Sequence, residues 1–125
     1  MDLKLLENEY AVYKFPVNYE IEKTIYGNDF VSVTKTEDEL SIVAVSGSLD
    51  HFTEKEDGWR ILKINEILDF SLTGILSKIS AVLAGSKISI FALSTYNTDY
   101  IMIKNNRLDE AIKVLEKNNY GISGK

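Results

Sequence analysis

The stretch "SLTGILSKISAVLAGSK" (71–87), followed by "ISIFALS" (88–94), predicts a helix that leads directly into a β-strand. Apolar residues recur at the i, i+3, i+4, i+7 spacing of one helical face. They are Leu72, Ile75, Leu76, Ile79, Val82 and Leu83. Ser71 is a candidate N-terminal cap and Gly85 a candidate end. We therefore expect one face of this helix to pack on a sheet that contains 88–94.

The sequence around this stretch continues the alternation of strands and helices. Residues 58–64 ("GWRILKI") and 99–104 ("DYIMIK") are rich in strand-forming residues. A final helix is expected within 105–121, with Asn106 as its cap and Gly121 after it. Its buried face would consist of Leu108, Ala111, Ile112 and Leu115. With a short edge strand after Gly121, the order is βαββα(β).

The first half shows a similar order of elements. Strands are expected at 10–15, 30–36 and 39–45, and a short helix at 17–28. Residues 46–52 form a loop or a short helical turn. The order βαββ(α) therefore precedes βαββα(β), although no clear residue identity relates the two halves.

This order predicts an α+β fold made of two tandem modules, residues 1–57 and 58–125. Strands and helices that alternate in this way form antiparallel sheets with the helices on one face. Each half is too small to bury a good core alone. We expect the halves to pack together or to join their sheets edge to edge.

Composition narrows the range of functions. The formal charge is −5 with no Lys/Arg cluster, which argues against nucleic-acid binding. No apolar run approaches the roughly 20 residues of a membrane span, and the N-terminus lacks a secretory pattern. The expectation is a cytoplasmic protein that binds neither nucleic acid nor membrane.

The sequence offers little for catalysis or for metal binding. There is no cysteine and a single histidine, His51, beside Asp50. Neighbours on one loop rarely provide a nucleophile, a base and an orienting group in the required geometry. The acidic run 37–39 lacks the calcium-loop pattern and is expected to form a turn. We expect no catalytic residue, no metal and no cofactor.

The segment "STYNTDY" (94–100) carries more polar side chains than a turn needs. Asn97 and Asp99 are residues that stabilise turns through their own backbone. The same groups could equally form one wall of a ligand site. Both interpretations stay open at this point.

The second half resembles the ACT domain, a βαββαβ regulatory module that binds amino acids. The resemblance rests on the strand "WRILKI", the helix and strand of 71–94, "FALSTYNTDYIMIK" and "LDEAIKVLEKNNYGI". It covers about 58–122 and is weaker in the first half. The second half is similar in particular to a subfamily of small bacterial two-module proteins, which are related in fold to CASTOR-type arginine sensors. The resemblance implies two tandem ACT-like, ferredoxin-like modules.

An amino-acid ligand presents a carboxylate and an ammonium group. The first amides of a helix lack partners and attract an anion, and a glycine allows close approach. The expected carboxylate site is therefore the helix start: Ser71, Leu72, Thr73, Gly74 and Ile75. Asp99 is the candidate for the ammonium group, Thr95 and Thr98 for hydrogen bonds, and Tyr96 for covering an apolar stem.

These expectations favour a regulatory or sensor protein without catalytic activity. It would bind an amino acid or a similar small ligand, form a homodimer, and act on a separate regulated protein. The alternative is a dimerisation or protein-interaction module that binds no small molecule.

Overall fold

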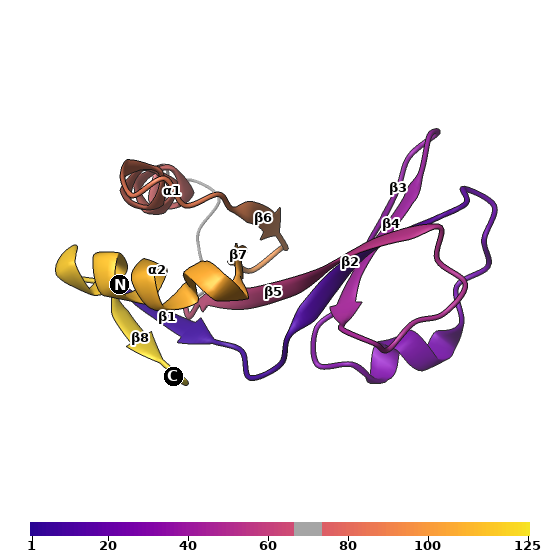
Figure 1. Ribbon diagram of the computed structural model, residues 1–125, viewed down its shortest axis with the longest axis horizontal. Helices are drawn as coiled ribbons and strands as arrows, with labels where there is room; N and C mark the ends of the chain where they lie inside the picture. Colours follow the sequence, from indigo (N-terminus) through magenta and orange to yellow (C-terminus); the bar gives the residue numbers. More distant parts are fainter. Residues whose placement is uncertain (67–73) are drawn as a thin grey trace. The chain divides into compact units, whose positions relative to one another are not determined.

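The structure, a computed structural model, describes residues 1–66 and 74–125 and divides into two compact units (Figure 1). The N-terminal unit consists of Asn8–Gly58. The C-terminal unit combines Met1–Glu7 with Trp59–Lys125. The first residues therefore belong with the second half of the chain, whereas the division into modules 1–57 and 58–125 stays a prediction.

The C-terminal unit follows the expected alternation of strands and helices. Its elements after the unit boundary are the end of β5 (Glu54–Ile64), α1 (Ile75–Gly85), β6 (Phe91–Ser94), β7 (Asp99–Lys104), η2 (Asn105–Arg107), α2 (Leu108–Lys117) and β8 (Gly121–Ser123). The predicted strand at the C-terminal end is confirmed as β8. The α+β class is confirmed as well.

A strand that the sequence did not reveal completes this sheet. β1 (Asp2–Leu5) lies between β5 and β8, antiparallel to the former and parallel to the latter. β7 pairs with the other edge of β5 and also with β6, both antiparallel. The described strands thus follow the order β6-β7-β5-β1-β8, and both ends of the chain lie in this sheet.

Both helices of the C-terminal unit cover the same face of its sheet. Alternate residues of the strands point to that face and pack with the apolar sides of α1 and α2. The buried cluster is Leu3, Leu5, Leu62, Ile64, Ile79, Leu83, Ile88, Ile101, Ile103, Leu108, Ala111, Ile112 and Leu115. Every predicted buried residue of the last helix belongs to it.

The N-terminal unit is mainly a small antiparallel sheet. Its elements are β2 (Tyr10–Phe15), the 3₁₀ turn η1 (Lys23–Gly27), β3 (Ser32–Lys35) and β4 (Leu40–Val45), followed by the start of β5. The strands follow the order β3-β4-β2-β5. One face holds a cluster of Ala11, Tyr13, Phe15, Ile25, Leu40, Ile42 and Ala44. The prediction of a helix at 17–28 is wrong, because the helical part of this segment is the short 3₁₀ turn η1. Ile25 is the one residue of this turn that is buried, so the turn lacks the apolar face of an α-helix.

The prediction that Gly85 ends its helix is confirmed, although a later residue takes the left-handed conformation. In α1, Lys87 takes a left-handed backbone (φ 58°), while Gly85 is the last helical residue. The Ile88 amide donates to the Leu83 carbonyl (3.0 Å) and the Lys87 amide to that of Ala84 (2.9 Å). This is the Schellman pattern of bonds.

α2 ends in the same way. Asn119 is the left-handed residue (φ 70°), and the amide of Tyr120 donates to the carbonyl of Leu115 (3.1 Å). Gly121 instead begins β8. Gly121 thus follows the helix as predicted, but the left-handed residue is Asn119.

The helix starts also differ from the prediction. Gly74 occupies the N-cap position of α1 with φ 80° and no side-chain cap. The predicted cap, Ser71, lies outside the described residues. Asn106 does not cap α2, because it lies inside η2, and Arg107 takes the N-cap position. Within the ranges 1–66 and 74–125, no helix is long and apolar enough to cross a membrane.

Candidate functional site

The turn between β6 and β7 is held by its own polar groups. The Thr95 amide donates to the Thr98 carbonyl (2.8 Å), and the Thr95 hydroxyl donates to the same carbonyl (3.2 Å). The Thr98 amide in turn donates to that hydroxyl (3.4 Å). Much of the polarity of "STYNTDY" therefore serves the turn itself.

Thr98 also fixes the turn to the neighbouring strand. Its side chain is buried, and its hydroxyl donates to the Ile64 carbonyl at the end of β5 (2.8 Å). Thr98, proposed from the sequence as a ligand-binding residue, thus also connects the turn to β5. A hydroxyl that already donates to a backbone carbonyl can still accept a hydrogen bond from a ligand.

Asp99 and Tyr96 differ strongly in their surroundings. Asp99 faces Ser94 across the hairpin, and one of its carboxylate oxygens accepts a hydrogen bond from the Ser94 hydroxyl (2.5 Å). Tyr96 is 81% exposed, at the tip of the turn. Most of this aromatic ring therefore lies at the surface, where a ligand or a second chain could contact it.

The start of α1 leaves its backbone open. Among the described residues, a Cβ atom placed on Gly74 would meet nothing within 4 Å, and the N-cap residue, a glycine, has no side chain to cap the helix. Ile75 is half-buried and packs against the core. The other three predicted residues of this segment, Ser71, Leu72 and Thr73, lie outside the described residues.

A hollow of about 520 Å³, open to solvent, lies beside the hairpin turn in the C-terminal unit. Its lining consists of Lys63, Asn65, Glu66, Thr95, Asn97, Thr98 and Tyr100. The structure thus brings Thr95 and Thr98 together with a cation and an anion from the end of β5. Sequence reasoning missed Lys63 and Glu66. Lys63 and Glu66 lie near the turn because β5 pairs with β7 in a register that places Lys63 opposite Tyr100.

Ile75 does not line this hollow. It contributes to another one, together with Met1, Lys78, Asn118, Asn119 and Tyr120. The described part of the helix start and the hairpin turn therefore line separate hollows. The convergence of 71–75 with 95–99 stays a prediction, since three of its residues lie outside the described ranges.

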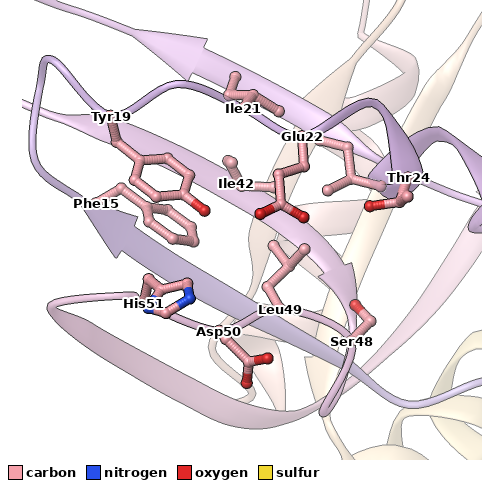
Figure 2. A pocket seen from close by; sticks show the side chains of 11 residues that line it. Phe15, Tyr19, Ile21, Glu22, Thr24, Ile42, Ser48, Leu49, Asp50 and His51 are labelled. Atoms are coloured by element: carbon pink, nitrogen blue, oxygen red, sulfur yellow. The ribbon is translucent and has the colours of Figure 1, made fainter.

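The N-terminal unit contains a hollow of its own, of about 440 Å³ including its open mouth (Figure 2). Its lining consists of Phe15, Tyr19, Ile21, Glu22, Thr24, Ile25, Ile42, Ser48, Leu49, Asp50 and His51. Aromatic and aliphatic side chains form its base, and two carboxylates and a histidine lie around it. The sequence singled out only His51 and Asp50 here, and for a different role.

A model of the ACT domain matches residues 54–117, which is more than half of the chain. The chain belongs to the ACT domain family. The match covers the hairpin turn and α1 of the C-terminal unit. A second family model, of an N-terminal domain, matches residues 8–50 of this ACT protein.

Relatives of known structure share the fold. A protein from Agobacterium tumefaciens is 28% identical with a TM-score of 0.87, over 97% of this chain and 90% of that one. The regulatory subunit of aspartate kinase from Thermus thermophilus is 8% identical with a TM-score of 0.60, over 88% and 92% of the two chains.

A curated relative is described as a sensor. The cytosolic arginine sensor for mTORC1 subunit 1 of Homo sapiens is 30% identical over 66 residues, 52% of this chain and 20% of that protein. The chain therefore spans about a fifth of the length of the curated relatives it matches.

Proposed function

We propose that this protein is a regulatory amino-acid sensor without catalytic activity. The observation that carries the proposal is the match of the ACT domain to 54–117, the segment that contains both α1 and the hairpin turn. A relative that is 30% identical over 66 residues of the chain is named as an arginine sensor. The ligand is an amino acid or a molecule that presents the same carboxylate and ammonium groups.

The carboxylate of the ligand binds at the start of α1, in Ser71–Ile75. Gly74 supports this role, because its positive φ suits a glycine and no atom of the described residues lies within 4 Å of its Cβ position. Ser71, Leu72 and Thr73 remain in the proposal as predictions from the sequence.

The ammonium group binds at the hairpin turn. Asp99 accepts one hydrogen bond from Ser94, and its second carboxylate oxygen is the proposed acceptor. Thr95 and Thr98 line the polar hollow beside the turn, whereas Asp99 and Tyr96 are not among its described lining residues. The exposed Tyr96 is proposed to cover the stem of the ligand. Lys63 and Glu66 add opposite charges at the same hollow, which suits a zwitterion.

The output of binding is a change of assembly or of partner affinity. A ligand shifts such an equilibrium only by its differential affinity for the two states. We propose a cytoplasmic homodimer that acts on a separate regulated protein. Calorimetry with each of the twenty amino acids tests the sensor role. Absence of heat and of a thermal shift at millimolar ligand would contradict it.

Replacement of Asp99 by Ala tests the ammonium site. We expect the affinity for the amino acid to fall by about tenfold or more, because a charge-assisted hydrogen bond contributes about 1.5–3 kcal/mol. The matched control is Asp109→Ala, since Asp109 is exposed in the first turn of α2. Equal affinities of both variants in calorimetry would remove Asp99 from the site.

A dimerisation module without a ligand is the alternative, and one observation favours it. Within the described strands, β6 pairs only with β7, so its other edge offers unpaired backbone groups. A stable dimer in sedimentation experiments, combined with a negative amino-acid screen, would support this role instead.

A further inference from the structure

We propose that the hollow of the N-terminal unit is a second ligand site, which binds a small primary amine with an aromatic body. This site lies within residues 15–51 and shares no residue with the amino-acid site proposed above. Nothing in the proposed sensor function requires it. The two proposals can therefore fail independently.

The base of the hollow is apolar and aromatic. Phe15, Ile25 and Ile42 are all less than 5% exposed and belong to the core of the unit. Tyr19 stacks on Phe15 with ring centroids 4.4 Å apart and an angle of 24° between the rings. Because Phe15 is buried beneath it, the half-buried Tyr19 is the ring of this stack on which a ligand could lie, and a planar aromatic group suits that position.

The entrance to the hollow is acidic. Figure 2 shows the Glu22 carboxylate and the Tyr19 hydroxyl directed toward its centre, with Asp50 on the opposite side. Neither Glu22 nor Asp50 forms an ion pair with any residue that the structure describes. A carboxylate above an aromatic base matches a protonated amine on a short apolar body.

The charge of the whole unit favours the same class of ligand. Asn8–Gly58 contains eleven acidic and four basic residues, a net charge of −7. Met1–Glu7 with Trp59–Lys125 contains eight acidic and ten basic residues, a net charge of +2. A negative field attracts a cation and repels a carboxylate. The N-terminal hollow should therefore prefer an amine to the corresponding amino acid.

His51 contributes its ring to this hollow from a left-handed backbone (φ 67°). Non-glycine residues in this region are uncommon and concentrate at functional sites, because the conformation is strained. The adjacent hydroxyl of Ser48 is already used, since it donates to the Val45 carbonyl (2.6 Å). Because its carboxylate is directed toward the centre of the hollow (Figure 2), Glu22 is the group that we assign to the ammonium of the ligand.

The test uses the ¹⁵N-labelled full-length chain with 2-phenylethylamine, phenylalanine and 2-phenylethanol as probes. We expect the amine to shift amide signals within residues 15–25 and 42–51. Phenylalanine and the alcohol should bind there about tenfold more weakly or not at all, since one carries a carboxylate and the other no charge. No shift in these ranges at millimolar amine would overturn the proposal.

Glu22→Gln tests the assigned contact, and Glu20→Gln is the matched control, because Glu20 is exposed and does not line the hollow. We expect the first variant to bind the amine about tenfold more weakly and the second to bind it as the parent chain does. If both variants lost the same affinity for the amine, the effect would come from the overall negative charge of the unit, and the proposed site would be overturned. Unchanged spectra of the free variants show that both fold.

The same spectra separate the two proposals. Amino-acid binding at the C-terminal unit shifts residues 63–66 and 95–100 and leaves 15–51 unchanged. A chain that binds the amine but none of the amino acids contradicts only the sensor function. A chain with the opposite behaviour contradicts only the amine site.

Discussion

At the scale of single residues, the polar side chains of the hairpin turn divide into two kinds. The Thr98 side chain is buried and its hydroxyl donates a hydrogen bond to the Ile64 carbonyl, whereas the Tyr96 side chain is mostly exposed. Both come from the same short segment, and the sequence pattern alone does not distinguish them. Burial distinguishes a residue that holds the turn from one whose side chain lies at the surface.

We predict that Thr98→Val destabilises the protein by about 1–3 kcal/mol. Valine fits the space, but the Ile64 carbonyl then loses its partner in a buried position. Urea unfolding measures the difference. Thr34→Val, on the exposed side of β3, is the control and should change stability by less than about 0.5 kcal/mol. Similar losses in both variants would contradict this role.

The residues of the candidate site were only partly predictable for a related reason. Thr95 and Thr98 stand out as a polar cluster in the sequence, and the structure does place them at a hollow. Lys63 and Glu66 belong to a segment about thirty residues earlier. Only the pairing of β5 with β7 brings them to the turn, and sequence reasoning did not predict this register.

At the scale of elements, the helix ends show how hydrogen bonding can override residue preference. Glycine is the usual left-handed residue after a helix, yet α1 uses Lys87 and α2 uses Asn119. In each case the next residue is apolar or aromatic and packs with the core. Burial of Ile88 and Tyr120 therefore determines where each helix stops.

Lys87→Gly should stabilise the protein by about 0.5–1 kcal/mol. The left-handed conformation costs a non-glycine residue about 1–2 kcal/mol, and glycine loses part of that gain through its more flexible unfolded state. Thermal unfolding measures the change. Lys113→Gly, in the exposed middle of α2, should instead destabilise by about 1 kcal/mol. A loss of stability in both variants would contradict the view that the left-handed conformation of Lys87 is strained.

Elements with strong apolar periodicity were predictable, and weakly patterned ones were not. β7 and the body of both helices lie where the sequence puts them, because their apolar faces are long and regular. β1 has only four residues, and β5 begins with the charged run "EKED" at 54–57. Such strands form because a neighbouring strand supplies their hydrogen bonds, which no local pattern reveals.

At the scale of the whole molecule, both chain ends help to build one unit. β1 and β8 pair in parallel, and Gly124 lies directly against β1. A Cβ atom on Gly124 would come within 2.5 Å of the Leu5 carbonyl oxygen, and φ is +82°. The backbone of Gly124 therefore packs so closely against that of Leu5 that no larger residue fits at position 124.

Gly124→Ala should release the C-terminal strand from the sheet. The added methyl group would clash with backbone, which a side-chain rotation cannot relieve. Amide hydrogen exchange should become faster at residues 121–123 and in β1. Gly47→Ala is the control, because Gly47 has a similar φ (+78°) but open space around its Cβ position. Slow exchange of 121–123 in the Gly124 variant would contradict this account.

The pairing of the two chain ends also has a consequence for the order of folding. The Ser123 hydroxyl bonds to the Leu3 carbonyl across 120 positions of chain, and closing so long a loop is entropically costly. Asn8–Gly58 forms a unit from one continuous segment and can fold with shorter loops. Once it has folded, its two ends bring Glu7 and Trp59 nearer to each other than an unfolded segment would. We therefore expect the N-terminal unit to act as an internal folding aid, and destabilising it should slow the completion of the C-terminal sheet.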